Sequence, residues 1–180
     1  MTLEDFDVPF DGYFAERQYV TTFAKNIVHE DLYDLGLEPL LRNGPLVELG
    51  CGLGTFLEIL GGLRPDLKMI GIDGRSTYLD EARTRINQNT ELRQARFDNL
   101  PFPNSSVPLI YSHRIYQYCN EKSYPEIARE ISRVLKSGGV YISVEGMKEY
   151  KHAFIEAGLI SLIDDDYNIG VFRKENGELK

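Results

Sequence analysis

The segment Val47-Glu48-Leu49-Gly50-Cys51-Gly52-Leu53-Gly54 decides the fold of this chain. It joins a short apolar run, residues 46–49, to a segment with helical period, residues 55–60. Glycine lets the backbone turn sharply and approach a ligand without a Cβ, and a helix N-terminus offers N–H groups to negative charge. The segment therefore predicts a strand–turn–helix unit that binds a ligand beyond the carboxyl end of the strand. A tight turn without a ligand is the alternative.

The spacing of the glycines separates this turn from two other glycine-rich sites. The dinucleotide fingerprint G-x-G-x-x-G would place its third glycine at position 55, where this chain has Thr55. A phosphate-binding P-loop would need Lys followed by Ser or Thr after the last glycine, and Thr55-Phe56 provides neither. The spacing argues against a nicotinamide-dependent oxidoreductase.

Apolar runs alternate with segments of helical period on both sides of the turn, which predicts a parallel sheet with crossover helices. We expect strands at residues 46–49, 68–73, 92–98, 107–112, 140–144, 159–163 and 169–172. We expect helices at residues 55–60 and 76–89, one that opens with a capping box at residues 123–126 and ends at residues 137–139, and one that stops at Gly158. Residues 164–168 read as a hairpin-like turn.

The first forty residues have a different pattern, because residues 20–28 and 32–41 each fit an amphipathic helix. They are too short to bury a core of their own. We therefore expect a single domain over residues 1–180, with a helical cap at residues 1–44 and a core at residues 45–174.

Composition excludes several classes of protein. The chain has 180 residues and a net charge of −8, and it lacks the clustered Lys and Arg that a phosphate backbone requires, so nucleic acid is disfavoured. No apolar run is long enough to span a membrane, and the first residues are acidic, unlike a targeting peptide. Cys51 and Cys119 form no disulfide framework and have no metal-ligand spacing, so we expect a cytoplasmic protein without a metal.

The segment at residues 47–54 resembles motif I of class I S-adenosylmethionine-dependent methyltransferases. Three further segments resemble the family in the same order: Asp73 at the end of the second strand, residues 97–106, and residues 131–139. The resemblance covers about residues 45–172. The variant that the chain most resembles is the small-molecule type found among quinone-biosynthesis methyltransferases.

The resemblance implies a fold and a cofactor. The fold is an α/β three-layer sandwich: a mostly parallel seven-stranded sheet of order 3-2-1-4-5-7-6, its last strand antiparallel, with helices on both faces and an N-terminal helical extension. The cofactor is S-adenosylmethionine, with S-adenosylhomocysteine as its product. The implied cofactor-binding residues are Glu48, Gly50, Cys51, Gly52, Gly54, Asp73, Gly74, Asp98, Asn99 and Ser112.

Within that set, the resemblance gives each group a part of the cofactor. Glu48 and the glycines would hold the methionine moiety, Asp73 the ribose, and Asp98 with Asn99 the adenine. A surface carboxylate at a strand end is the alternative for Asp73 and for Asp98.

The chain also departs from the family pattern. Val107-Pro108 stands where the family has Phe-Asp, and Ser137 stands where it has Pro. No insertion follows the fifth strand, so acceptor contacts must come from the N-terminal helices, from residues 112–122, or from a partner subunit or second copy. Four tyrosines could line a lid or belong to the core: Tyr13, Tyr19, Tyr116 and Tyr118.

The residues after the fourth strand stand where relatives meet their acceptor. His113 is a candidate general base, Arg114 a candidate partner for an anionic group, and Glu145 could face the same pocket. Ordinary structural roles remain open for all three. No N-P-P-Y follows the strand, which argues against methylation of DNA adenine or protein glutamine.

Two functions remain open from the sequence. The first is methyl transfer to a small organic acceptor at oxygen, nitrogen or carbon. The alternative is a regulatory or partner-dependent protein that binds S-adenosylmethionine or S-adenosylhomocysteine without methylating anything.

Overall fold

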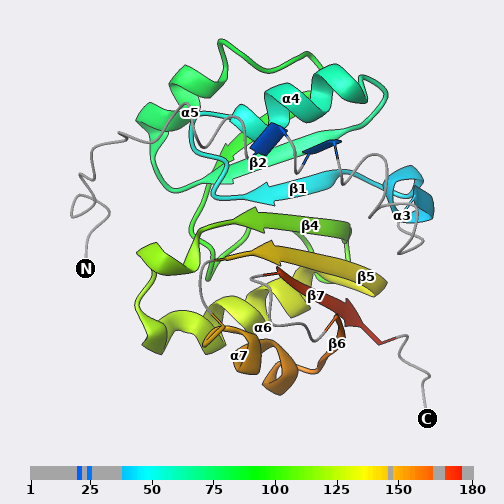
Figure 1. The fold of residues 1–180 in the computed structure, drawn as a ribbon, viewed down its shortest axis with the longest axis vertical. Helices are drawn as coiled ribbons and strands as arrows, with labels where there is room; N and C mark the ends of the chain where they lie inside the picture. The colour runs from blue at the N-terminus through cyan, green and yellow to red at the C-terminus, as the bar shows by residue number, and fades with distance from the viewer. Residues whose placement is uncertain (1–19, 22–23, 26–37, 146–147, 164–168, 176–180) are drawn as a thin grey trace.

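The computed structural model describes residues 20–21, 24–25, 38–145, 148–163 and 169–175 (Figure 1). The strands are β1 (Leu46–Leu49), β2 (Met69–Asp73), β3 (Thr90–Gln94), β4 (Val107–His113), β5 (Leu135–Val144), β6 (Leu159–Ile163) and β7 (Ile169–Lys174). The α-helices are α3 (Glu38–Arg42), α4 (Thr55–Leu63), α5 (Ser76–Ala82), α6 (Tyr124–Val134) and α7 (Lys151–Glu156), and two 3₁₀ turns are η3 (Tyr116–Tyr118) and η4 (Glu121–Ser123). Residues 20–21 and 24–25 are helical as well.

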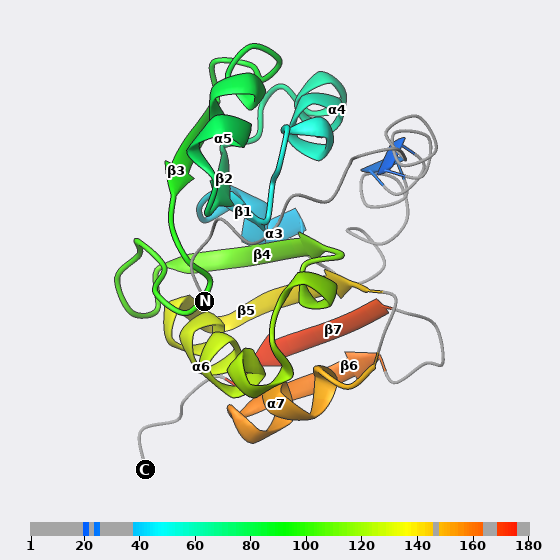
Figure 2. The same ribbon diagram turned by 90° about the vertical axis from the view of Figure 1, so that its left-hand side faces the viewer.

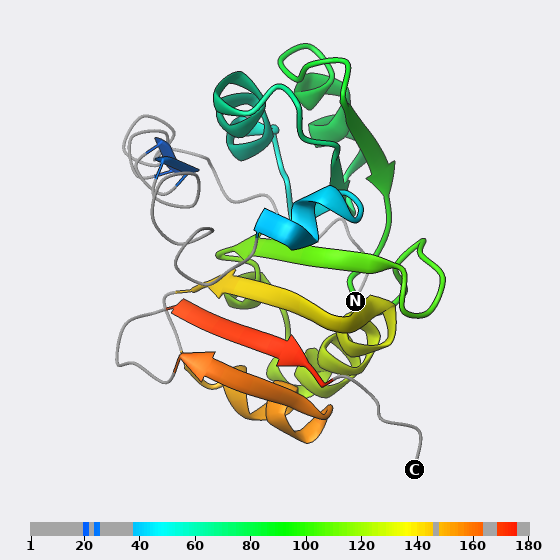
Figure 3. The same ribbon diagram turned by 90° about the vertical axis from the view of Figure 1, so that its right-hand side faces the viewer.

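The strands form one sheet in the order β3-β2-β1-β4-β5-β7-β6, which confirms the predicted order. β1 to β5 pair in parallel, whereas β7 is antiparallel to β5 and to β6. β3 and β6 lie at opposite ends of the sheet (Figures 2 and 3). The arrowheads of β1, β4 and β5 point to the same side (Figure 1), so the residues after these strands meet at one edge.

Two apolar clusters cover the two faces of the sheet, because the central strands are buried on both sides and read as nearly continuous apolar runs. One cluster joins α3, α4 and α5 to the sheet through Leu41, Phe56, Leu57, Leu60 and Leu79, and it also contains Val20 and Ala24. The other joins α6 and α7 to the opposite face through Ile127, Ile131, Val134 and Phe154. The three-layer α/β sandwich is therefore confirmed.

Two predicted boundaries between β2 and β4 are wrong. The helix predicted at residues 76–89 ends at Ala82. The Thr84 hydroxyl donates to the Glu81 carbonyl at 2.8 Å, and such side-chain bonds compete with helical ones. The strand predicted at residues 92–98 occupies Thr90–Gln94, because its neighbour β2 ends at Asp73 and gives it no further partner.

Both ends of α6 also differ from the sequence prediction. No capping box forms, because the Ser123 hydroxyl donates to the Asn120 carbonyl and does not cap the helix. At the other end the helix stops at Val134, not at residues 137–139, and Leu135 already pairs with Val107 of β4. The Lys174 ammonium group donates to the Leu135 carbonyl at 2.9 Å and so helps to end the helix there.

Pro108 interrupts the pairing of β4 with β5. The register shifts between Val107 and Leu109, as expected where a residue lacks the N–H that a ladder requires.

Some predictions lie outside the described residues: the turn at residues 164–168, most of the two N-terminal helices, Tyr13 and Tyr19. Within the described part of the chain, no helix has the length and apolar character needed to cross a membrane.

Candidate cofactor and acceptor site

The glycine turn is docked on the end of β2 by its backbone. The Gly50 and Cys51 N–H groups both donate to the Ile72 carbonyl, at 2.7 and 3.0 Å. The Gly54 N–H then donates to the Cys51 carbonyl at 2.8 Å, and α4 begins at the next residue. The turn is therefore a rigid link between β1 and α4 at the edge where the parallel strands end.

The three glycines of the turn all have positive φ, but they differ in what surrounds them. A Cβ on Gly50 would lie 2.4 Å from Cγ2 of Ile115, and one on Gly54 would lie 3.0 Å from Cβ of Ala82. A Cβ on Gly52 would meet nothing within 4 Å among the described residues. Gly50 and Gly54 are thus required by packing, whereas Gly52 faces space that no described residue fills, where a ligand can approach the backbone.

Two carboxylates lie beside the turn. Asp73 is held in place by the N–H groups of Gly52, at 3.0 Å, and Arg75, at 2.9 Å, one on each oxygen. Each oxygen keeps a second lone pair for another donor. Burial raises the pKa of Asp73 although both of these hydrogen bonds oppose that change.

Glu48 is buried, and its Oε2 atom has no hydrogen-bond partner among the described residues. Burial, and then the charge of Asp73, raise the pKa of Glu48 to about 8. A buried polar atom without a partner is rare in a folded protein and calls for an explanation. A ligand that brings a donor or a positive charge to this oxygen would provide one.

Three other predicted cofactor residues lie at the same edge. Cys51 is buried in the turn, and the Gly74 carbonyl accepts a hydrogen bond from the Gln94 side chain at 2.9 Å. The Ser112 hydroxyl is fully buried and lies 2.7 Å from the Tyr141 hydroxyl. This hydroxyl therefore belongs to an internal network between β4 and β5.

The loop between β3 and β4 contains the predicted adenine residues. Asp98 forms an ion pair with Arg96 at 2.6 Å, which lowers the pKa of Asp98, and Asp98 helps to line a surface hollow beside α6. The Asn99 N–H donates to the Arg96 carbonyl at 3.2 Å. The residue of this loop that reaches the glycine turn is Phe97, whose Cζ lies 3.5 Å from where a Cβ of Gly50 would be.

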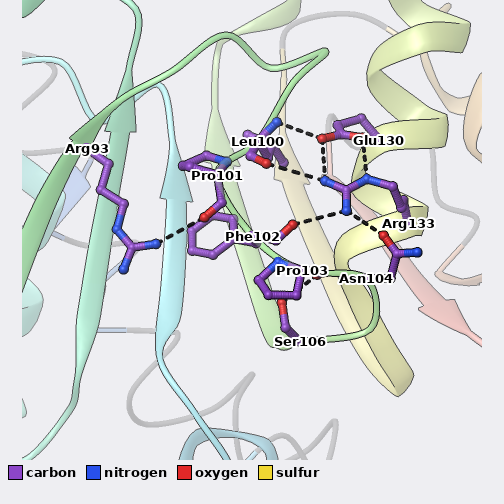
Figure 4. A network of polar contacts seen from close by, with 9 residues as sticks. All are labelled: Arg93, Leu100, Pro101, Phe102, Pro103, Asn104, Ser106, Glu130 and Arg133. Carbon is purple, nitrogen blue, oxygen red and sulfur yellow. Dashed lines mark hydrogen bonds and ion pairs between the residues drawn. The ribbon is translucent and has the colours of Figure 1, made fainter.

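Arg133 of α6 fixes the same loop (Figure 4). Its five N–H donors are all used by nearby acceptors: the Glu130 carboxylate, the carbonyls of Leu100 and Phe102, and the side chain of Asn104. Glu130 also accepts the Leu100 N–H at 2.6 Å. The guanidinium group thus connects the helix to the loop at several points at once.

We expect Arg133→Lys to lower the free energy of unfolding by about 1–2 kcal/mol, because an ammonium group cannot replace a planar fork of five donors. Urea denaturation checks this. Arg129→Lys is the matched control, since Arg129 makes an exposed bond to the Pro125 carbonyl on the same helix and should change stability by less than about 0.5 kcal/mol. Equal effects of the two substitutions on stability would contradict the role of Arg133 in holding the loop between β3 and β4.

His113 and Arg114 lie at the end of β4. His113 is partly buried, and burial followed by the charge of Arg114 lowers its pKa to about 4. The ring is therefore neutral near pH 7 and can accept a hydrogen bond, but its lowered pKa makes it a weak general base. Arg114 is exposed and has a φ of 55°, a left-handed conformation that is uncommon outside glycine and is often found at functional sites.

Glu145 follows β5 and is only 2% exposed. Its two oxygens accept the N–H groups of Ile115, at 3.1 Å, and Tyr116, at 3.2 Å. Burial raises its pKa to about 7, although these hydrogen bonds oppose that change. Tyr116 is fully buried and stacks on Tyr150 at a centroid distance of 4.5 Å, so it belongs to the core, whereas Tyr118 is 44% exposed.

Sequence reasoning missed the two residues that pack on the turn, Ile115 and Phe97. Neither side chain has a polar or ionisable group that would identify it in the sequence as part of a binding site. The signal was indirect: each is an apolar residue in a loop that follows a strand of the predicted sheet, where it must meet the glycine-rich edge.

Among the described residues, no group of three or more His, Cys, Asp or Glu could hold a metal ion.

Comparisons with known proteins agree with the fold and with the family resemblance. A family model described as a methyltransferase domain matches residues 46–139. The biotin biosynthesis bifunctional protein BioHC of Cellvibrio japonicus is 35% identical over 102 residues, which are 56% of this chain and 20% of that protein. Dimethylglycine N-methyltransferase of Parasynechococcus marenigrum is 26% identical over 165 residues, which are 88% of this chain and 56% of that protein.

A solved structure shows the same fold. A chain of the complex between the Haloferax volcanii Trm112 methyltransferase activator and a methyltransferase has a TM-score of 0.61 at 18% identity, covering 92% of this chain and 99% of that chain. The chain spans less than two thirds of the length of the two relatives named above. Because the family model matches more than half of the sequence, the chain belongs to the methyltransferase domain family, within the class I S-adenosylmethionine-dependent methyltransferases.

Proposed function

We propose that this protein binds S-adenosylmethionine at the glycine turn and transfers its methyl group to a small organic acceptor held beyond β4. The observation that carries the proposal is the open face of Gly52 beside a buried Glu48 oxygen that has no partner among the described residues. A cofactor with a positive amino group and ribose hydroxyls suits this pair of carboxylates.

The residues present fit the cofactor. Glu48 would take the amino group of the methionine moiety, and Asp73, already oriented by two backbone N–H groups, would accept from the ribose hydroxyls. Phe97 and Asn99 would adjoin the adenine, with Asp98 close by. When bound, the cofactor supplies a methyl group on an activated sulfonium, so the protein has mainly to align the acceptor and exclude water.

The acceptor side would be formed by the residues that follow β4. The neutral ring of His113 can accept a hydrogen bond from an acceptor O–H or N–H and so orient it toward the methyl group. Arg114, exposed beside it, can pair with an anionic group of the acceptor. The net charge of −8 supports a small molecule over a nucleic acid, and one relative is named for methylation of dimethylglycine. The quinone-biosynthesis subtype stays a prediction.

The first test is calorimetric titration with S-adenosylmethionine and, separately, S-adenosylhomocysteine. Micromolar binding of both is expected. Release of S-adenosylhomocysteine is then measured with pools of small acceptors. Binding without turnover in any pool would favour a cofactor-binding or partner-dependent protein, and no binding of either compound would overturn the proposal.

We expect His113→Ala to lower kcat about tenfold or more with the acceptor found in that screen, while the affinity for S-adenosylhomocysteine changes less than about twofold. The reason is that His113 lies on the acceptor side of the turn and contributes no group to the pair of carboxylates. His152→Ala is the matched control, because His152 is an exposed residue of α7 that pairs with Glu156. An unchanged kcat in His113→Ala would remove this residue from the mechanism.

A further inference from the structure

Glu145 binds the backbone of the loop that follows β4 through two hydrogen bonds. One carboxylate oxygen accepts the Ile115 N–H and the other accepts the Tyr116 N–H. The Ser143 hydroxyl also donates to Oε1, at 3.3 Å. A buried carboxylate with a backbone donor on each oxygen fixes two consecutive peptide groups, because charge-assisted hydrogen bonds are stronger than neutral ones.

Ile115 connects these two hydrogen bonds to the glycine turn. Its side chain is 4% exposed and lies directly on Gly50, so closely that a Cβ on Gly50 would be 2.4 Å from Cγ2 of Ile115. The same residue thus contacts Glu145 through its N–H and the first glycine of the turn through its side chain. Close packing of this kind transmits a displacement from one side to the other.

A layer of buried hydroxyl groups lies next to Glu145. The Tyr141 hydroxyl lies 2.7 Å from that of Ser112 and 3.1 Å from that of Tyr116. The Ser112 hydroxyl also donates to Oε1 of Glu145, at 3.5 Å, whereas the Tyr141 hydroxyl lies one hydrogen bond further from the carboxylate. Removal of the Tyr141 hydroxyl therefore disturbs the same buried region while both hydrogen bonds from the backbone to Glu145 remain.

We infer that Glu145 is a positioning residue. It holds Ile115 against Gly50 and thereby couples the glycine turn to residues 113–116, which include His113 and Arg114. This inference rests on the proposed function. Glu145 acts through the loop and not on the acceptor, since it is only 2% exposed and its Oε1 atom also accepts from the buried Ser143 and Ser112 hydroxyl groups. Loss of the carboxylate leaves the residues that would hold the cofactor, Glu48, Gly52 and Asp73, in place.

Amide hydrogen exchange of Ile115 and Tyr116, with and without S-adenosylhomocysteine, tests the coupling. In the unmodified protein both amides exchange slowly, and the ligand slows them further. At a pH above the pKa of Glu145, which is about 7, both exchange at least about tenfold faster in Glu145→Ala, as expected for the loss of a bond to a charged acceptor. That variant still binds S-adenosylhomocysteine, but the ligand no longer protects these two amides.

Glu145→Gln supplies a graded rescue. The amide oxygen can accept one of the two N–H groups, while the NH₂ group faces the other, so one amide stays protected and the other exchanges faster. Tyr141→Phe is the matched control: it removes a hydroxyl from the same buried region and should leave exchange of Ile115 and Tyr116 within about twofold of the unmodified protein.

Three outcomes overturn the inference. Unchanged exchange in Glu145→Ala would show that the carboxylate does not hold the loop. An equal effect of Tyr141→Phe would show that only general destabilisation is at work. Ligand protection that persists in Glu145→Ala would show that the coupling between turn and loop does not run through Glu145. Failure of the unmodified protein to bind S-adenosylhomocysteine is read separately, by calorimetry, and would overturn the proposed function together with the coupling.

Discussion

Gly52→Val should weaken binding of S-adenosylmethionine and S-adenosylhomocysteine at least about 100-fold, as measured by calorimetric titration. A Cβ at this position would enter space that no described residue fills within 4 Å, on the side of the turn where the cofactor backbone contact is proposed. The branched side chain would occupy that space. The N–H of Gly52, which orients Asp73, would also be disturbed.

The substitution has a second effect that must be separated from the first. Gly52 has a φ of 50°, a conformation that costs a β-branched residue about 1–2 kcal/mol. Gly158→Val is the matched control, because Gly158 has a φ of 82° and, like Gly52, has no described residue within 4 Å of its Cβ position. It lies between α7 and β6, at the opposite edge of the sheet.

The two variants should therefore lose similar stability, but only Gly52→Val should lose the ligand. If both retain the affinity of the unmodified protein, the open face of Gly52 is not the cofactor site. If both lose affinity equally, the loss comes from destabilisation.

The central part of the fold could be predicted because it depends on local patterns. The apolar run at residues 46–49 and the glycines after it place β1 and its turn, and alternation of strands and helices predicts the crossovers. The sheet order came from the family resemblance, which uses the order of four motifs along the chain. The apolar and glycine patterns and the family motifs can each be recognised from residues that are neighbours in the sequence.

The boundaries that were wrong depend on contacts between distant residues. α6 ends at Val134 because Leu135 pairs with Val107 and its carbonyl is taken by Lys174, which belongs to β7. β3 ends at Gln94 because β2 offers no partner beyond Asp73. Local sequence contains none of this information.

The same reason explains which parts of the site were missed. Glu48, Asp73 and the glycines were expected at the turn, and the structure places them together. That Ile115 lies on Gly50, and that Glu145 binds the loop backbone, follows only from the pairing of β4 with β5. Burial also sets the pKa values of Glu48 and His113, and burial cannot be read from a motif.

Glu48→Gln should remove much of the pH dependence of stability in the protein without ligand. Burial and the charge of Asp73 raise the pKa of Glu48 from an ordinary 4.5 to about 8. A raised carboxyl pKa stabilises the fold fully below the unfolded value, and that stabilisation is lost as pH rises through the folded value. Between roughly pH 5.5 and 8.5 the unmodified protein should lose at most about 3 kcal/mol from this group.

Glu145, whose pKa is raised to about 7, contributes in the same direction over the lower part of this window, so Glu48→Gln should flatten the slope without abolishing it. The melting temperature measured across that pH range checks the expectation. Glu126→Gln is the matched control, because Glu126 is an exposed residue of α6 and its replacement should leave the slope unchanged.

Cofactor binding should show the opposite pH dependence. The carboxylate form of Glu48 attracts the positive amino group of the cofactor, so binding requires loss of a proton wherever Glu48 is protonated. Affinity for S-adenosylhomocysteine should therefore rise by up to about tenfold per unit between roughly pH 6 and 7.5, below the pKa of the amino group itself. In Glu48→Gln the affinity should be lower and nearly independent of pH over this range. A variant that kept the slope of the unmodified protein would show that the buried carboxylate does not contact the amino group, and the site would then have to be centred on Asp73 and Gly52 alone.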